Sequence, residues 1–214
     1  MKAGKSIVQV AAGTSHHAFP PRAEVAKRIF DLACALVLAP LLVIPALVVA
    51  GAILLDSRGP FLFRQTRVGR GGKPFTIYKF RTMREDTGDL PSHLASRAQL
   101  TRLGGRLRKL KLDEIPQLIN ILRGDMSFVG PRPCLPSQSD LIDARSRLGV
   151  MRLRPGITGP AQVEGIDMST PQRLATADAA YIVRWSFWRD LTLLWRTATG
   201  AGRGDAVNSL GAGD

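Results

Sequence analysis

The feature that most constrains this chain is an apolar stretch near its N-terminus. Residues 32–55 contain no charged side chain and almost no polar one. A straight helix of this length would reach about 36 Å, which exceeds the roughly 30 Å hydrocarbon core of a bilayer. We therefore expect this segment to enter a membrane.

Two prolines inside the stretch argue against one straight span. Pro40, preceded by Ala39, and Pro45 each remove a helical hydrogen bond and clash with the preceding turn, so a bend is expected there. The positive-inside rule draws both ends of the stretch to the cytoplasm, because basic residues lie on both sides of it. These are Arg22, Lys27 and Arg28 before it, and Arg58, Arg64, Arg67, Arg70 and Lys73 after it. A re-entrant helix that breaks at Ala39 and Pro40 satisfies both observations.

Two alternatives compete with the re-entrant helix. A tilted single span stays open. A cleaved signal peptide is suggested by the small residues Ala50, Gly51 and Ala52, but the long N-terminal lead and the length of the apolar stretch argue against it.

The composition restricts the classes of binding partner but does not select one of them. Thirty Lys and Arg against seventeen Asp and Glu give a net charge of +13, which predicts attraction to nucleic acid, anionic lipid or phosphorylated substrates. Cys34 lies in the apolar stretch and Cys134 in a proline-rich segment, so a disulfide framework is not expected. A reducing, cytoplasmic setting is the simplest inference.

The rest of the chain indicates a mostly helical α/β domain with a small β-hairpin. Residues 59–83 alternate aromatic or β-branched residues with polar ones around a glycine-rich centre, which predicts two short strands and a turn. Residues 101–110 carry leucines at helical spacing opposite basic side chains. A further helix is expected to start at Asp113, with Pro116 in its first turn. Its buried stripe is predicted to be Ile115, Leu118, Ile119 and Leu122.

Aromatic residues near the C-terminus recur at helical spacing. Tyr181, Trp185, Trp188 and Trp195 would share one helical face, with arginines on neighbouring faces. This pattern is typical of an amphipathic helix in the head-group region, although a core helix would show the same spacing.

The adjacent carboxylates Asp113 and Glu114 are the main candidates for chemistry. Taken alone, an Asp helix cap followed by a Glu would explain them. The neighbouring cations Arg108, Lys111 and Arg132 exceed what a cap requires, and they favour a site for a diphosphate. An ionised carboxylate there could act as a nucleophile or bind Mg²⁺. The order Pro131-Arg132-Pro133 restricts the backbone around a guanidinium that could hold a phosphate.

Five ordered motifs resemble the bacterial sugar transferase family, the monotopic phosphoglycosyl transferases. The resemblance runs from about Lys27 to about Trp195. The motifs are Lys27-Arg28-Ile29-Phe30-Asp31, Tyr78-Lys79-Phe80-Arg81-Thr82-Met83, Leu112-Asp113-Glu114-Ile115-Pro116-Gln117-Leu118, Gly124-Asp125-Met126-Ser127-Phe128-Val129-Gly130-Pro131-Arg132-Pro133 and Arg154-Pro155-Gly156-Ile157-Thr158-Gly159.

The resemblance implies a two-step reaction on a UDP-sugar. Asp113 matches the nucleophile that would attack the sugar-linked phosphorus and expel UMP, and polyprenol (undecaprenyl) phosphate would then take up the phosphosugar. Glu114 matches the Mg²⁺-binding residue, and Arg108 and Arg132 match phosphate contacts. Lys79 and Arg81 lie in a motif near the site and are also expected to bind substrate phosphate.

The resemblance also implies a monotopic protein in the bacterial inner membrane, with its catalytic domain on the cytoplasmic face and flanked by amphipathic interfacial helices. The expected division is a flexible tail at 1–22, a re-entrant helix at 23–56, a catalytic domain at 57–199 and a tail at 200–214. Inner-membrane lipid is an expected partner and nucleic acid is not, and a homodimer is left open. The chain departs from the family in having Ala39 where Ser often precedes the proline, and Gly165-Ile166 where Gly-Arg is frequent.

Two other functions compete with this one. A glycosyltransferase that moves only the sugar would release UDP where a phosphoglycosyl transferase releases UMP. A membrane-tethered basic binding module would need neither carboxylate, and the lack of a recognisable nucleic-acid motif counts against it.

Overall fold

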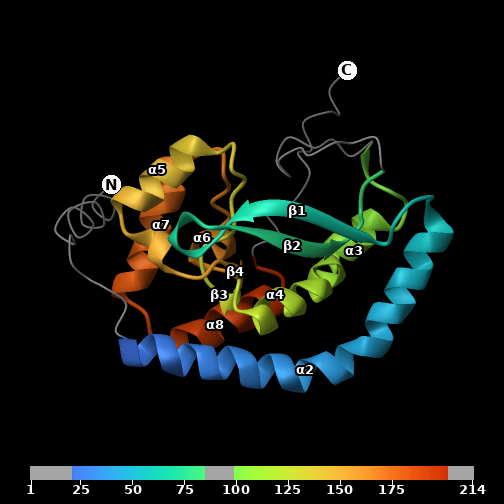
Figure 1. Ribbon diagram of the computed structural model, residues 1–214, viewed down its shortest axis with the longest axis horizontal. Helices are drawn as coiled ribbons and strands as arrows, with labels where there is room; N and C mark the ends of the chain where they lie inside the picture. Colours follow the sequence, from blue (N-terminus) through green and yellow to red (C-terminus); the bar gives the residue numbers. More distant parts are fainter. Residues whose placement is uncertain (1–20, 85–98, 202–214) are drawn as a thin grey trace.

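The computed structural model describes residues 21–84 and 99–201, which form a small mixed domain lying along one long helix (Figure 1). The predicted tails lie almost wholly outside these residues. The α-helices are α2 (Pro21–Asp56), α3 (Gly104–Lys109), α4 (Leu118–Arg123), α5 (Ser139–Arg147), α6 (Pro160–Val163), α7 (Pro171–Val183) and α8 (Phe187–Ala198). The strands are β1 (Leu62–Val68), β2 (Pro74–Phe80), β3 (Ser127–Val129) and β4 (Gly156–Thr158), and short 3₁₀ helices are η1 (Arg70–Gly72), η4 (Leu112–Gln117) and η5 (Val150–Arg152).

Helix α2 contains the whole apolar stretch. It is long and apolar enough to cross a membrane. Only 11% of its most apolar 18-residue segment is buried, so it is not the core helix of a water-soluble domain. The helix includes Pro40 and Pro45 and bends away from a straight axis, as Figure 1 shows. The bend agrees with the effect expected of the prolines. The re-entrant path through a bilayer stays a prediction.

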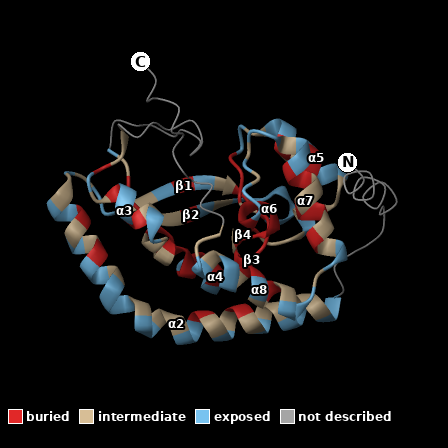
Figure 2. Ribbon diagram, turned by 180° about the vertical axis from the view of Figure 1, so that it is seen from behind, coloured by how far each residue is buried: buried red, intermediate tan, exposed pale blue. Residues whose placement is uncertain are grey.

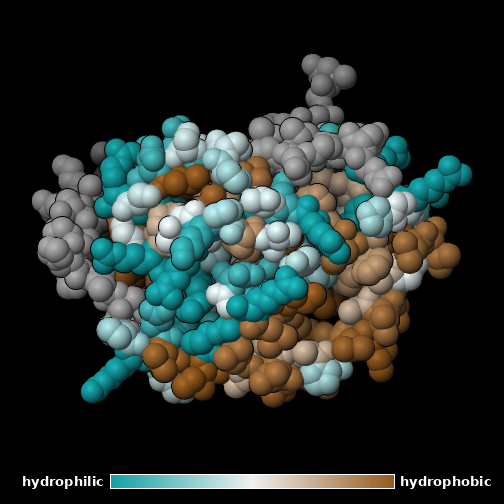
Figure 3. Space-filling view, in the orientation of Figure 1, coloured by the Kyte–Doolittle hydropathy of each residue, from teal (hydrophilic) through white to brown (hydrophobic). Residues whose placement is uncertain are grey.

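Exposed apolar side chains gather along α2 and α8. In α2 they include Leu36, Leu41, Ile44 and Leu47, each at least 64% exposed. Figure 3 shows apolar residues along the edge of the molecule that α2 forms, with hydrophilic ones above them. An exposed apolar surface of this kind marks a membrane or protein contact. With the length of α2, it indicates membrane association.

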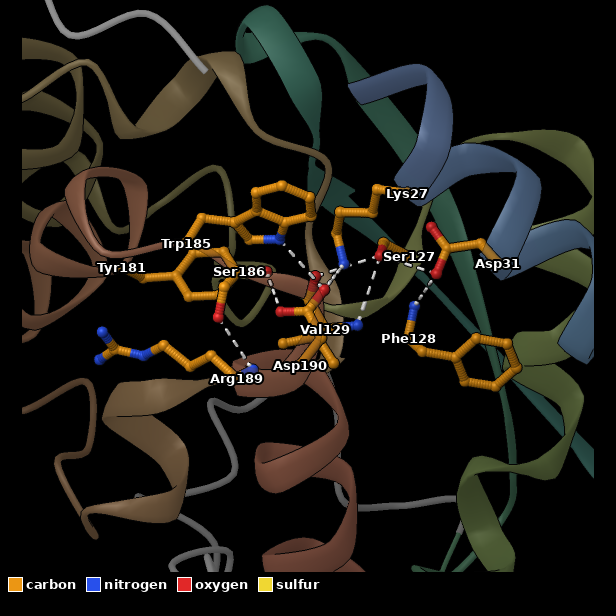
Figure 4. Close-up of polar contacts among 10 residues, drawn as sticks. All are labelled: Lys27, Asp31, Ser127, Phe128, Val129, Tyr181, Trp185, Ser186, Arg189 and Asp190. Carbon is orange, nitrogen blue, oxygen red and sulfur yellow. Dashed lines mark hydrogen bonds and ion pairs between the residues drawn. The ribbon is translucent and has the colours of Figure 1, made fainter. Parts of the chain in front are cut away.

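A buried carboxylate joins α2 to α8. Lys27 Nζ lies 2.6 Å from Asp190 Oδ2, the Tyr181 hydroxyl donates to Asp190 Oδ1 at 2.7 Å, and the Trp185 indole donates to Oδ2 at 3.2 Å (Figure 4). Asp190 is 2% exposed. A charge buried this deeply requires such partners, so the network fixes how the two helices dock.

A second carboxylate joins α2 to β3. Asp31 Oδ1 accepts hydrogen bonds from the Ser127 hydroxyl and the Phe128 backbone N–H, both at 3.1 Å (Figure 4). Both ends of the Lys27 to Asp31 motif therefore hold the domain against the N-terminal half of α2.

The predicted hairpin is confirmed. Strands β1 and β2 pair antiparallel, from Leu62 opposite Phe80 to Val68 opposite Pro74. Gly71 and Gly72 take positive φ angles of 66° and 75° in the turn, which glycine adopts without strain. The glycine-rich centre thus forms the turn that the sequence predicts.

A parallel pair, β3 with β4, lies at the centre of the domain (Figure 2). Every residue of β3 and of α6 is buried. The backbones approach so closely that a Cβ on Gly156 would lie 2.1 Å from Gly130 N, and one on Gly159 would lie 2.2 Å from Gly130 O. Only glycine fits these positions, and the pairing brings two of the family-like motifs together.

The structure corrects two helix predictions. The aromatic residues near the C-terminus do not share one face, because the chain breaks between α7 and α8. Ser186 begins α8, and its side chain accepts from the Arg189 N–H at 3.2 Å. As a result Tyr181 is buried at 1% exposure, whereas Trp188 and Trp195 are more than 70% exposed. Helix α8 is therefore amphipathic and presents its tryptophans outward, as predicted for an interfacial helix.

The predicted stripe after Asp113 is also wrong in part. The segment starts as the 3₁₀ helix η4 and becomes α-helical only at Leu118. The change from about 3.0 to 3.6 residues per turn rotates the buried face. Leu118 and Ile121 are buried, whereas Ile119 and Leu122 are about 40% exposed.

Candidate active site

Asp113 and Glu114 lie in the first turn of η4, and each is 6% exposed. They do not cap a helix: the residue before η4 is Lys111, which has a φ of 59°, and no side chain caps this end. Burial of two adjacent carboxylates is costly unless cations or hydrogen bonds compensate. Helix capping therefore does not explain the two carboxylates, and neighbouring cations must compensate for their burial.

Glu114 is the centre of a small ion cluster. Its Oε1 lies 3.1 Å from Lys79 Nζ and 3.9 Å from Arg132 Nη1. Lys79 comes from β2, which packs against η4, and Arg132 comes from the loop after β3. The structure thus brings together three residues predicted from the sequence, from three separate segments.

The loop that carries Arg132 is held from behind by a buried ion pair. Arg145 Nη1 donates to the Arg132 carbonyl at 2.8 Å. The same guanidinium bonds Asp178 Oδ2 through Nη2 at 2.7 Å and through Nε at 3.0 Å. Arg145 and Asp178 are 3% and 1% exposed. Burial raises the pKa of Asp178, and the Arg145 charge opposes that shift.

Gln162 supports the same loop from α6. With its amide oxygen facing Arg132, Gln162 accepts from Arg132 Nη1 at 3.0 Å and donates to the Ile157 carbonyl at 3.2 Å. One guanidinium nitrogen of Arg132 therefore has two oxygen neighbours, Gln162 and Glu114. These contacts fix the arginine on the side of the carboxylates.

Arg108 has an unused donor. Its Nε donates to Thr82 Oγ1 at 2.9 Å, which fixes the plane of the guanidinium. Its Nη1 is buried and has no hydrogen-bond partner among the described residues. A buried donor left unpaired costs about 1–3 kcal/mol, so its presence at a site suggests that a ligand completes it.

Gln117 shows the same property and was not singled out from the sequence. It is 2% exposed, and its Nε2 has no partner within the described part of the chain. It follows Glu114 by three residues in a 3₁₀ helix, where such positions lie on one face. That spacing was visible in the sequence, but it carries meaning only once the 3₁₀ form is known.

Arg81 lies elsewhere. Its guanidinium donates to the carbonyls of Arg58 and Ser57 and to Ser57 Oγ, the last at 3.0 Å. It thereby caps the C-terminal end of α2 and forms no hydrogen bond or ion pair with Glu114. The phosphate-binding role expected for Arg81 stays a prediction.

The donor set suits Mg²⁺ in part. Mg²⁺ in phosphoryl-transfer sites is bound by one or two carboxylates together with substrate phosphates and water. Both cations near Glu114 lie on Oε1, and no described residue bonds Oε2. Glu114 Oε2 could therefore serve as a ligand beside Asp113. No group of three or more acidic, His or Cys side chains occurs in residues 21–84 and 99–201, so substrate oxygens would have to supply the other ligands.

Comparisons with known proteins agree with the sequence motifs. The family described as bacterial sugar transferase matches residues 22–203. A UDP-glucose:undecaprenyl-phosphate glucose-1-phosphate transferase of Caulobacter vibrioides is 47% identical over 188 residues, covering 81% of this chain and 68% of that protein.

Two further relatives differ in length. An uncharacterized sugar transferase, EpsL, of Bacillus subtilis is 38% identical and covers 81% of this chain and 85% of its own length. An undecaprenyl-phosphate glucose phosphotransferase of Komagataeibacter xylinus is 42% identical over 80% of this chain, which corresponds to 35% of that longer protein. The family match contains α2 from Arg22 onward and every residue of the Glu114 cluster. The chain therefore belongs to the bacterial sugar transferase family.

Proposed function

We propose that this protein transfers a sugar 1-phosphate from a UDP-sugar to a polyprenol phosphate such as undecaprenyl phosphate. The observation that carries the proposal is the buried pair of Asp113 and Glu114. Cations that suit a diphosphate surround the pair, and the domain that holds it docks on a helix long and apolar enough to cross a membrane. Named relatives act on UDP-glucose and undecaprenyl phosphate, which supports both substrate classes. The sugar itself is left open.

In the first step, a carboxylate oxygen of Asp113 attacks the sugar-linked phosphorus of the donor. The bond between this phosphorus and the bridging oxygen breaks, and UMP leaves with that oxygen and its electron pair. The sugar phosphate stays on Asp113 as an acyl phosphate. Adjacent placement on one buried turn allows Asp113 to react while Glu114 stays bound to its cations.

In the second step, a phosphate oxygen of the lipid acceptor attacks the same phosphorus. The bond to Asp113 breaks, the carboxylate is restored, and a polyprenyl diphosphate sugar forms. Splitting one difficult transfer into two is the usual benefit of a nucleophilic residue.

Fixed positive charge assists both steps. Arg132 is held by Arg145 and Gln162, and Arg108 by Thr82, so little reorganisation is needed as charge develops on the leaving UMP. Lys79 compensates the negative charge of Glu114 through their ion pair. Mg²⁺, held by Glu114 and substrate phosphate, would neutralise diphosphate charge.

The membrane setting follows from the acceptor. Polyprenol phosphate is confined to the bilayer, and a domain docked on a helix in one leaflet meets it there without extracting it. We place the catalytic domain at the cytoplasmic face of the inner membrane, because UDP-sugars and the basic flanks of α2 both belong on that side. The product would begin assembly of an exopolysaccharide, capsule, O-antigen or glycoprotein glycan.

The released nucleotide distinguishes this reaction from transfer of the sugar alone. We expect the purified protein, given Mg²⁺, undecaprenyl phosphate and a panel of UDP-sugars, to release UMP with at least one donor. Removal of Mg²⁺ with EDTA should abolish release, and Glu114→Gln should lower it at least about 100-fold. Release of UDP in place of UMP would establish the competing glycosyltransferase.

A further inference from the structure

A cavity of about 350 Å³ lies apart from the Glu114 cluster. It is bounded by the N-terminal half of α2, the turn η1, the segment η5 and strand β3. Neither Asp113, Glu114 nor Arg132 lines it. Its volume is within the roughly 300–1,000 Å³ range of small-molecule pockets.

Positive charge exceeds negative charge on its walls. Five basic and two acidic side chains line the cavity. Asp190, which pairs with Lys27 from outside the wall, raises the acids to three, so an excess of two positive charges remains. The basic residues are Lys27, Arg28, Arg70, Arg152 and Arg154, and the acidic ones are Glu24 and Asp31.

Two of the arginines are held in place by backbone carbonyls. Arg28 Nη1 donates to Ile121 O at 2.7 Å, and Arg154 Nε donates to Gly124 O at 3.1 Å. Both carbonyls lie at the end of α4, so two guanidinium groups converge there despite their like charge. A guanidinium whose orientation is fixed loses less entropy when it binds an anion.

Arg152 is the cation of the cavity wall whose guanidinium is available to bind a ligand. It is exposed, its backbone N–H donates to the Gly149 carbonyl, and its guanidinium forms no hydrogen bond or ion pair with any residue in the described ranges. Arg70 and Arg154 share Glu24, so one carboxylate serves two guanidinium groups. The wall is therefore short of negative charge in the absence of a ligand.

The cavity lies where the protein changes from charged to apolar. Lys27, Arg28 and Asp31 directly precede the apolar stretch of α2. Phe30 packs on Phe187 of α8 with ring centroids 4.9 Å apart, and the neighbouring Trp188 is 76% exposed. Exposed tryptophan beside basic residues is typical of the membrane–water boundary.

We propose that this cavity binds a phosphate group at the membrane surface, separately from the substrate phosphates at Glu114. The chemistry that would be recognised is a phosphate held by the Arg28, Arg152 and Arg154 guanidinium groups. It could come from the head group of an anionic phospholipid or from soluble phosphate. Occupancy would hold the N-terminal half of α2 at an anionic bilayer surface.

The test uses the full chain in a non-ionic detergent. Thermal unfolding is measured against inorganic phosphate, dioctanoyl phosphatidylglycerol and, as a zwitterionic control, dioctanoyl phosphatidylcholine, with NaCl at matched ionic strength as the blank. Arg152→Gln removes the unpaired cation. Arg147→Gln, on α5, is the matched charge control, because Arg147 does not line the cavity and its Nε donates to the Asp143 carbonyl. Arg132→Gln reports binding at the Glu114 cluster.

We expect saturable stabilisation that Arg152→Gln weakens about five-fold in affinity, the effect of one interfacial cation, and that Arg147→Gln leaves unchanged. Saturation by phosphatidylglycerol alone would identify a lipid head group, and saturation by inorganic phosphate alone a soluble ligand. No saturable effect, an equal effect in Arg152→Gln, or loss only in Arg132→Gln would overturn the proposal. UMP release does not enter this test, so its outcome is independent of the proposed function.

Discussion

At the scale of single residues, the position of Arg132 depends on a side chain outside the candidate active site. Arg145 holds the Arg132 carbonyl and is itself held by Asp178. The pair is almost fully buried, so neither charge can be satisfied by water. Such a pair contributes little net stability while intact, but loss of one partner leaves the other charge uncompensated.

We therefore expect Asp178→Asn to lower the free energy of unfolding by about 3 kcal/mol. Denaturant unfolding followed by tryptophan fluorescence would measure it. Asp143→Asn, on the exposed face of α5, is the matched control and should change stability by no more than about 0.5 kcal/mol. Equal stabilities of the two variants would show that the buried pair does not hold this loop.

The residues of the site were only partly predictable from the sequence. Asp113, Glu114 and Arg132 could be selected by charge and by motif, and the structure places Glu114 beside Arg132. Proximity in a motif does not fix the direction of a side chain, as Arg81 shows: two residues after Lys79 it lies on carbonyls at the end of α2. Arg145 and Gln162 could not be selected, because their role appears only when distant segments meet.

At the scale of elements, the docking of α8 on α2 rests on hydrogen bonds to Asp190. Burial beside Asp190 raises the pKa of Tyr181 above its usual value of 10.0, so its hydroxyl stays protonated and donates. The folded protein therefore keeps this proton to a higher pH than the unfolded chain does. The resulting stability is fully present below pH 10 and is lost as the pH rises above it.

This gives a pH-dependent expectation for Tyr181→Phe. At pH 8 the variant should lose about 1–2 kcal/mol of unfolding free energy, because Asp190 loses one donor. Above pH 10 the difference from the unsubstituted protein should shrink. Unfolding measured at a series of pH values would show it, and a difference that is constant up to pH 11 would contradict the assignment.

Elements with local signals could be predicted, and those with distant partners could not. The hairpin and the apolar helix carry their signal in consecutive residues. In the sequence the aromatic residues keep a helical spacing across Ser186, so the helix break there is not visible. The 3₁₀ helix η4 differs from an α-helix only slightly in residues per turn, and the spacing of apolar residues does not reveal that difference. The parallel pair β3 and β4 has three residues per strand and a separation of nearly thirty residues, so only tertiary packing defines it.

At the scale of the whole molecule, the position of the catalytic domain depends on the path of α2 through the bilayer. Its two ends lie against the same domain, through Lys27 at one end and Arg81 and Asp56 at the other. A path straight through the membrane would have to separate them. We therefore expect both ends of α2 on one side.

Cysteine labelling tests this arrangement. Ala26→Cys and Arg58→Cys, both exposed positions, are made separately in a Cys34→Ala background. The remaining Cys134 is fully buried, and burial raises the pKa of its thiol, so it should react slowly. A membrane-impermeant maleimide should label both sites in inside-out vesicles and neither in spheroplasts. Labelling from opposite sides would establish a single span.

The most direct test of the proposed reaction is whether Asp113 carries the sugar phosphate. Intact-protein mass spectrometry is applied after incubation with Mg²⁺ and a competent UDP-sugar, without acceptor. We expect a mass increase of one sugar phosphate that disappears when undecaprenyl phosphate is added, and no increase for Asp113→Asn. A sugar phosphate retained by Asp113→Asn, or lipid-linked product formed by that variant at the normal rate, would show that Asp113 is not the nucleophile.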